Sequence, residues 1–330
     1  MARRENAAEI TARIHRDTII IDAHCDTIER AYRAGANLAH FPAAQLDFAR
    51  LLAVGVKVQF FAAYIATEYK PERSLKRVLQ LIDFFHQQLA QNSQYVRLVR
   101  RMMDITKAIQ SGQIAALLSV EGGEPVEGDL AYLRILYRLG VRSLGLTWNQ
   151  RNQLADGVGE RETQGGLTLY GRAVVQEMNR LGMLIDVSHM SEAGFWDVIQ
   201  ETQHPVIASH ANCYALVPHP RNLTDDQITA LANVGGVVGI TFVPEFLAED
   251  DKAIVTRVLD HIEHVTQLVG VDHVGIGSDF DGTETTLPGL EDVTRLPQLT
   301  EGLLKRGYSG EEIQKIMGGN FLRVLKQVIG

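Results

Sequence analysis

Histidine and carboxylate side chains occur in this 330-residue sequence at the points where short apolar stretches end. The first stretch finishes in Asp22-Ala23-His24-Cys25-Asp26, and four others finish at a single acidic or histidine residue. The side chains of interest are His24, Asp26, Glu121, His189, His210 and Asp279. One such residue after a strand is usually a loop residue or a helix cap, but five stretches that all end this way indicate a common site. Imidazole and carboxylate groups together are typical ligands of zinc and similar divalent ions.

These residues exceed what one zinc ion with an open position requires, because such a site uses three protein ligands. His24 and Asp26 are two residues apart, so in a strand they share a face. If Glu121 bridges two ions, His24 and Asp26 complete one site, and His189 and His210 complete the other. Two ions about 3.5–4 Å apart share a hydroxide and stabilise an oxyanion. The residues therefore predict two Zn²⁺ per chain and metal-assisted hydrolysis, with Asp279 free to move protons.

The elements that must position these side chains are short apolar runs, which we interpret as buried parallel strands because they do not alternate with polar residues. The predicted strands are Thr18–His24, Val56–Tyr64, Ile114–Glu121, Ser143–Trp148, Met183–His189, Val206–His210, Val237–Phe242 and Val274–Asp279. Stretches of helical period lie between them. The predicted helices are Leu75–Leu89, Leu130–Leu139, Leu169–Leu181, Glu192–Ile199, Asp225–Val234 and Lys252–Val269. Capping boxes are expected at Thr224 with Gln227 and at Ser309 with Glu312.

Eight strands that alternate with helices predict an α/β fold of the (β/α)₈ TIM-barrel type, whose active site lies at the carboxyl ends of the strands. A doubly wound open sheet is the alternative, but it requires a glycine-rich turn where this sequence has His24-Cys25-Asp26. We find no internal repeat and no linker. The prediction is one catalytic domain over residues 1–330, with residues 1–17 as a helical lead-in.

The composition excludes several classes of protein. The formal net charge is −8, so a basic surface for nucleic acid is not expected. No apolar run approaches the roughly 18 residues that span a bilayer, and the amino terminus does not resemble a secretion signal. Two cysteines allow at most one disulfide bond. We expect a cytoplasmic protein without membrane or nucleic-acid partners.

The segments IDAHCDT, SVEGGE, DVSHMS, ASHAN, HPRN, GSDFDG and GLEDV resemble those of the membrane dipeptidase (renal dipeptidase) family of zinc metallopeptidases, over nearly the whole chain. The resemblance implies a barrel with two zinc ions that hydrolyses dipeptides, often with a D-residue at the carboxyl-terminal position. It also implies that Glu121 bridges the ions, that Arg221 holds the substrate carboxylate and that Asp279 contacts the substrate amine and moves a proton. Family members are commonly dimeric, so a homodimer is included among the expectations.

One position departs from the family pattern. Where many members have a histidine that orients the substrate, this sequence reads Leu146-Thr147-Trp148-Asn149. Tryptophan offers one N–H donor and cannot take up a proton, so we expect the change to affect the substrate and the activity on ordinary dipeptides, and the metal site to be retained. Trp148 and Asn149 are predicted to line the substrate site, with Asn152 as an alternative source of the polar contact. The competing function is a related metal-dependent amidohydrolase that acts on a β-lactam, an N-acyl amino acid or a lactone.

Other polar residues carry weaker signals. His261 and His264 are three residues apart on a predicted helix, which we interpret as an exposed face. His219 is interpreted as a loop residue. Strand alternation predicts that Cys25 and Asp186 point toward the outer helices, Asp186 because its parity is opposite to that of His189.

Overall fold

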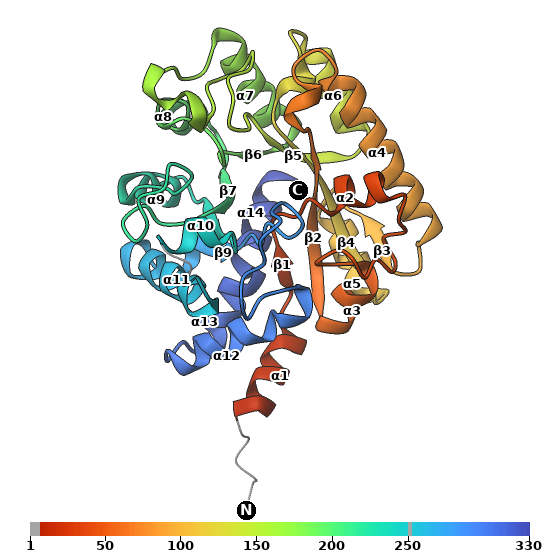
Figure 1. The fold of residues 1–330 in the computed structure, drawn as a ribbon, viewed down its shortest axis with the longest axis vertical. Helices are drawn as coiled ribbons and strands as arrows, with labels where there is room; N and C mark the ends of the chain where they lie inside the picture. The colour runs from red at the N-terminus through yellow and green to blue at the C-terminus, as the bar shows by residue number, and fades with distance from the viewer. Residues whose placement is uncertain (1–6, 250–252) are drawn as a thin grey trace, which may run out of the picture.

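Eight parallel strands form a closed barrel in the computed structural model of the chain, which describes residues 7–249 and 253–330 (Figure 1). The ring runs β1-β2-β4-β5-β6-β7-β8-β9 and closes where β9 pairs with β1. The strands are β1 (Ile20–Asp22), β2 (Val56–Tyr64), β3 (Val96–Leu98), β4 (Ile114–Glu121), β5 (Val141–Gly145), β6 (Leu184–Asp186), β7 (Ile207–Ala211), β8 (Val237–Ile240) and β9 (Val274–Ile276). This closure confirms the predicted (β/α)₈ fold and excludes the open sheet.

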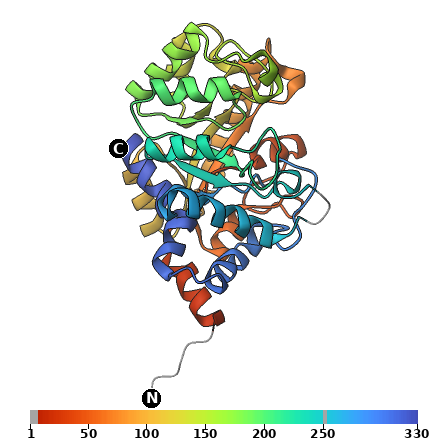
Figure 2. The same ribbon diagram turned by 90° about the vertical axis from the view of Figure 1, so that its left-hand side faces the viewer.

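Helices surround the strands on the outside of the barrel (Figures 1 and 2). They are α1 (Ala7–Asp17), α2 (Thr27–Ala34), α3 (Phe48–Val54), α4 (Ser74–Gln91), α5 (Met102–Gln110), α6 (Leu130–Arg138), α7 (Leu169–Leu181), α8 (Glu192–Glu201), α9 (Asp225–Asn233), α10 (Pro244–Leu247), α11 (Val255–Val269), α12 (Pro297–Lys305), α13 (Gly310–Gln314) and α14 (Asn320–Val328). Each predicted helix is present, and both predicted capping boxes form. Residues 1–6 of the predicted lead-in and Lys252 of the last predicted helix lie outside the described residues.

The strand β3 was not predicted from the sequence. It pairs with the amino-terminal part of β4, where Val96 lies opposite Ile114. On the same edge of β4, β5 begins pairing only at Leu118. The short β3 therefore fills the half of that edge that β5 leaves open.

Two apolar clusters separate the inside of the barrel from its helical layer. Ala115 and Leu117 of β4 belong to a cluster with the apolar face of α14, while Ala116 and Leu118 belong to the cluster that includes the outer helix α4. This alternation is what a pleated strand imposes. It places the side chain of Glu121 on the interior side at the carboxyl end of β4, while α14 packs at the opposite end.

Five predicted strands end earlier than expected, among them β5 at Gly145 and β8 at Ile240. β1, β6 and β9 stop at Asp22, Asp186 and Ile276, two or three residues before the histidine or aspartate that was predicted to end each strand. His189 has φ of 67° and Asp279 has φ of 63°, so both lie in the left-handed region that few residues other than glycine adopt. The chain leaves the regular strand at these points, and simple alternation no longer gives the direction of the side chain.

No helix among the described residues is both long and apolar enough to cross a membrane.

Candidate metal centre

The six predicted side chains meet at the carboxyl ends of the strands. Glu121 ends β4 and His210 lies in β7, whereas the others come from the segments that follow β1, β6 and β9. Four of the six, Asp26, Glu121, His189 and Asp279, line a cavity of about 300 Å³. His24 and His210 are buried next to them, His24 against Asp279 and His210 against His189. Larger hollows of about 620 and 750 Å³ elsewhere on the surface contain none of the six.

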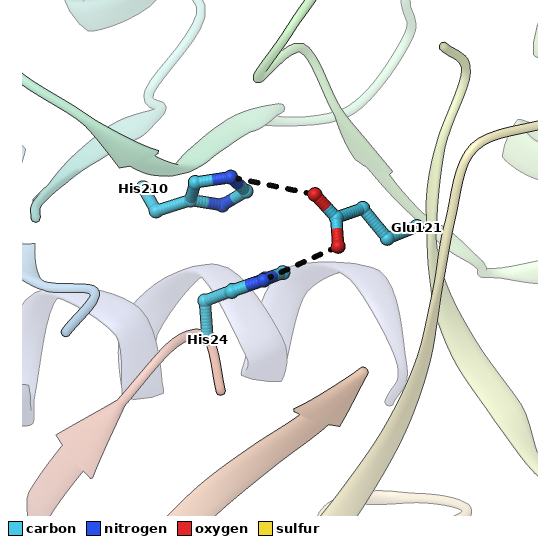
Figure 3. A group of neighbouring side chains, drawn as sticks. All are labelled: His24, Glu121 and His210. Atoms are coloured by element: carbon cyan, nitrogen blue, oxygen red, sulfur yellow. Dashed lines mark ion pairs between the residues drawn. The ribbon is translucent and has the colours of Figure 1, made fainter. Parts of the chain in front are cut away.

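Glu121 divides the cluster into two parts, each facing one of its carboxylate oxygens. In the first half-site, His24 Nε2 lies 3.6 Å from Glu121 Oε2, 3.5 Å from Asp26 Oδ2 and 3.7 Å from Asp279 Oδ1. In the second half-site, Glu121 Oε1 lies 2.9 Å from His189 Nε2 and 3.7 Å from His210 Nε2. Figure 3 shows His24 and His210 each facing a different oxygen of Glu121.

The cluster fits divalent cations better than it fits hydrogen bonds among its own members. His24 Nε2, Asp26 Oδ1 and Glu121 Oε2 are buried and have no hydrogen-bond partner among the described residues. Such atoms are costly to bury unless a ligand satisfies them. Six carboxylates and two guanidinium groups line the cavity, and their ionised forms leave an excess of four negative charges, which two divalent ions would balance. The donor set of imidazole and carboxylate suits zinc.

Burial and mutual charge shift the pKa of each group. Burial acts to lower the pKa of His24, but the charges of Glu121 and Asp26 outweigh it and raise this pKa well above its usual value. Burial acts to raise the pKa of Glu121, yet His24 and His189 hold that pKa well below its usual range. Burial lowers the pKa of His189 to about 3 and that of His210 well below its ordinary value. The second half-site therefore presents two neutral imidazoles beside a carboxylate.

Asp279 was predicted to contact the substrate amine and to move a proton, and it lies beside the proposed metal ligands. Its Oδ1 is as near to His24 Nε2 as Glu121 is, and a Cβ added at Gly282 would lie 2.2 Å from Asp279 Oδ1 and 2.4 Å from Asp26 Oδ2. Only glycine allows the two carboxylates to share this place. Burial raises the pKa of Asp279, which suits a group that must hold a proton during part of a reaction.

The segment after β5 contacts the second half-site. Asn149 lines the cavity, as predicted for a substrate-binding residue. Its Oδ1 also lies at hydrogen-bond distance, 2.7 Å, from Nδ1 of His189, which is a proposed metal ligand. Trp148 lines the cavity, with its ring 5.9 Å from the ring of His189 and 5.5 Å from that of Tyr64. The side chain of Asn152, the alternative candidate, forms hydrogen bonds with the backbone of residues 146, 154 and 155. It therefore stabilises the local turn of the chain.

Arg221 projects into the cavity from the segment after β7. Its side chain is buried, its NH2 group donates to the carbonyl oxygen of His210 at 3.0 Å, and its Nε has no hydrogen-bond partner within the described parts of the chain. Phe246 supports the guanidinium, whose carbon lies 5.5 Å from the ring centre. The remaining N–H groups are thus available to a carboxylate ligand.

The prediction for Asp186 was wrong. Its neighbours Ile185 and Val187 belong to the outer cluster, and Leu184 belongs to the inner one, so the Asp186 side chain lies on the interior side. There it accepts hydrogen bonds from the backbone N–H and the hydroxyl of Ser209. The error arose because counting backwards from His189 crosses the left-handed residue at which the alternation breaks.

Among the residues with weaker signals, Cys25 packs in the outer cluster as predicted. His261 is buried rather than exposed, and its Nδ1 accepts the backbone N–H of Cys213. His219 stacks on Phe246 at 4.5 Å and lines a neighbouring hollow.

Sequence reasoning missed the other residues that line the cavity. These are Glu29, Arg33, Tyr64, Val243, Glu245, Phe246, Asp281, Gly282 and Thr283. Tyr64 ends β2 opposite Glu121, so its place at the end of a predicted strand was the one available signal. The others lie on loops and helices whose positions depend on the assembled barrel.

Comparison with known proteins identifies the family. The chain matches membrane dipeptidase (peptidase family M19) over residues 8–329. The chain belongs to the membrane dipeptidase family. Membrane dipeptidase family members are metallopeptidases, so the chain is a metal-dependent hydrolase of the dipeptidase type.

Named members of the membrane dipeptidase family are similar to this chain in sequence and structure. Dipeptidase tcpJ of Claviceps purpurea is 36% identical over 296 residues, which cover 87% of this chain and 70% of the relative. Dipeptidase aclJ of Aspergillus oryzae is 37% identical over 295 residues, covering 86% and 70%. A metallopeptidase from Rhodobacter sphaeroides, solved with a phosphinate mimic of the dipeptide L-Ala-D-Ala, is 30% identical with a TM-score of 0.88, covering 94% of this chain and 100% of that one.

Proposed function

We propose that this chain is a dipeptidase that works with two zinc ions held on either side of Glu121. His24 and Asp26 would hold the first ion and His189 and His210 the second, and Glu121 would take part in holding both. The observation that carries this proposal is the division of the Glu121 carboxylate, whose Oε2 faces His24 at 3.6 Å and whose Oε1 faces His189 at 2.9 Å. A site for one catalytic zinc ion uses three protein ligands, so the donors on the two sides of Glu121 together exceed what one ion needs.

When bound, such a pair of ions supplies an activated water and an electrophile for the carbonyl oxygen of the scissile bond. The residues of the chain supply the rest of the reaction. Asp279 lies beside the first half-site and takes the proton of the attacking water, which it then gives to the departing amine. Its buried position raises its pKa and so favours the protonated form that the second transfer requires.

Arg221 limits the substrate to dipeptides in this proposal. Its buried guanidinium is fixed by the carbonyl oxygen of His210 and by the ring of Phe246, so it can bind a carboxylate only at a set distance from the half-sites. A longer peptide would place its terminal carboxylate elsewhere. The ligand of the Rhodobacter sphaeroides relative mimics L-Ala-D-Ala, which supports small dipeptides with a D-residue at the carboxyl-terminal position as substrates of this chain.

The test is metal analysis joined to an activity screen. Purified protein should hold about two divalent ions per chain and hydrolyse L-Ala-D-Ala. Glu121→Gln should lose most of both the metal and the activity, since the bridging position loses its charge. Glu127→Gln is the matched control, because Glu127 is a partly exposed carboxylate six residues away that does not line the cavity. Full metal content in the Glu121 variant would refute the bridging role.

A second candidate function has one observation in its favour. Trp148 places a large apolar face beside the cavity. It has no imidazole group that could donate a proton to a substrate carbonyl. Such a wall also suits the acyl chain of an N-acyl amino acid, or a β-lactam or lactone ring. Parallel assays of dipeptides and these compounds on the zinc-loaded protein separate the candidates. Faster turnover of a non-peptide substrate would favour the second.

A further inference from the structure

His189 and His210 bring their Nε2 atoms within 2.8 Å of each other, and both face Glu121 Oε1. An ionised carboxylate oxygen carries no proton. If neither Nε2 carries one either, three lone pairs converge on one point, and only a cation satisfies them. The position of the proton on each ring therefore decides whether the two Nε2 atoms can bind a cation. It is set by what each Nδ1 contacts.

We propose that Asp186 is a positioning residue that acts through Ser209 to keep the proton of His210 on Nδ1, so that Nε2 is free to bind the second ion. This inference rests on the proposed function, because it assigns a purpose to the bare Nε2. It concerns a residue that touches neither the substrate nor the proposed ions.

The direction of each hydrogen bond in this chain is fixed by its neighbours. Asp186 Oδ1 accepts from the backbone N–H groups of Ser188 at 3.0 Å and Ser209 at 2.9 Å. Asp186 Oδ2 accepts from the hydroxyl of Ser209. A serine hydroxyl has one proton, so Ser209 Oγ can only accept from His210 Nδ1, which lies 2.8 Å away. His210 must then donate from Nδ1.

Burial keeps water from changing this arrangement. Asp186 is 7% exposed, Ser209 2% and His210 1%. The register of β7 shifts between Ala208 and Ala211, which is typical of a bulge that redirects side chains. The shift allows the adjacent residues Ser209 and His210 to contact each other and the interior.

The backbone around Ser209 is closely packed. A Cβ added at Gly277 would lie 1.7 Å from the carbonyl oxygen of Ser209, and one at Gly239 would lie 2.1 Å from it. Because glycine stands at these points, in β8 and directly after β9, the carbonyl can sit where a side chain would exclude it. The hydroxyl of Ser209 is thus held at a fixed place between Asp186 and His210.

Asp186→Asn reverses the hydrogen bonds without changing the shape of the side chain. The position of Oδ1 accepts two backbone N–H groups, so the amide oxygen must take that position and the NH₂ group must face Ser209 Oγ. Ser209 then accepts from the amide and donates its own proton to His210 Nδ1. The proton of His210 moves to Nε2, where it points at the place of the second ion.

The experiment has two readouts. Long-range ¹H–¹⁵N correlation spectra of the metal-free protein with ¹⁵N-labelled histidine report which nitrogen of His210 carries the proton. Competition with a chelator reports the affinity for each zinc ion. The wild type should show His210 protonated on Nδ1. Asp186→Asn should show it on Nε2 and should bind the second zinc ion about 10- to 100-fold more weakly, the usual effect of removing a residue that orients a metal ligand.

Asp22→Asn is the matched control. Asp22 is also a buried aspartate that accepts from the N–H and hydroxyl of a serine, Ser278, at 2.8 and 2.7 Å. The hydroxyl of Ser278 next contacts the carbonyl oxygen of His24 at 3.1 Å rather than an imidazole ring. The control variant should therefore leave the proton of His210 on Nδ1.

The outcomes separate this inference from the proposed function. If His210 keeps its proton on Nδ1 in Asp186→Asn and the second ion binds with unchanged affinity, the inference is wrong. If the wild type binds only one ion, the proposed function fails, while the spectra still test the role of Asp186. Should Asp186→Asn not fold, Ser209→Ala removes only the hydroxyl and should lower the affinity for the second zinc ion by about tenfold. An unchanged affinity in that variant would also overturn the inference.

Discussion

Replacing Arg221 by alanine should change the preference of the enzyme for a free carboxylate far more than its general activity. Arg221 is buried, and its NH2 group donates one hydrogen bond to the carbonyl oxygen of His210. Two other N–H groups are free to bind a carboxylate oxygen each. Hydrogen bonds to a charged partner contribute about 1.5–3 kcal/mol each, whereas those to a neutral amide contribute about 1 kcal/mol. For two such bonds, the difference between the two kinds of substrate is therefore about 1–4 kcal/mol.

The assay compares kcat/KM for a dipeptide with kcat/KM for its carboxyl-terminal amide, in the wild type and in Arg221→Ala. The ratio of the two should fall by roughly 5- to 700-fold in the variant, since every 1.4 kcal/mol is a factor of ten. Any loss of activity that comes from releasing the His210 carbonyl affects both substrates and cancels in the ratio. An unchanged ratio would refute carboxylate recognition by Arg221, whatever the absolute activity of the variant.

The remaining predictions concern the proton carrier, the bulge and a buried ion pair. Asp279→Asn should lower kcat about 10²- to 10⁴-fold while metal analysis still finds both ions; loss of an ion would make Asp279 a ligand instead. Gly277→Ala, whose Cβ would lie 1.7 Å from the carbonyl oxygen of Ser209, should lower both the denaturation midpoint and the zinc content, whereas Gly310→Ala, with its nearest neighbour at 3.7 Å, should change neither. Lys70→Met leaves Glu124 buried without its partner at 3.2 Å and should lower the free energy of unfolding by about 3–5 kcal/mol; a urea titration that shows less than 1 kcal/mol would contradict this reasoning.

The sequence predicted the barrel because its strands are buried on both faces and its helices are not. β4 is the clearest case, since Ile114–Glu121 is apolar except for Ser119 and its last residue, and the structure gives the same bounds. The strand β3 was missed because Val-Arg-Leu is too short and too polar to stand out from a loop. β3 pairs with the amino-terminal part of β4, and that part is left open only because β5 pairs further along β4 in the assembled barrel.

The convergence of the proposed metal ligands could also be predicted, since parallel strands bring their carboxyl ends to one edge. The directions of those side chains could not. Asp186 was assigned to the wrong face because His189 adopts a left-handed conformation, which no pattern of apolar residues encodes. Asn149 lies 40 residues from His189 along the chain, so their hydrogen bond could not be predicted. Ser209 bonds the ring of the adjacent His210 at a bulge that the sequence does not reveal.

The most direct test of the two-ion centre is the anomalous scattering of crystals grown with zinc. The account predicts two peaks about 3.5–4 Å apart, one beside His24 and Asp26 and the other beside His189 and His210, with Glu121 between them. A single peak at full occupancy in the presence of excess zinc, or two peaks that do not share Glu121, would contradict it.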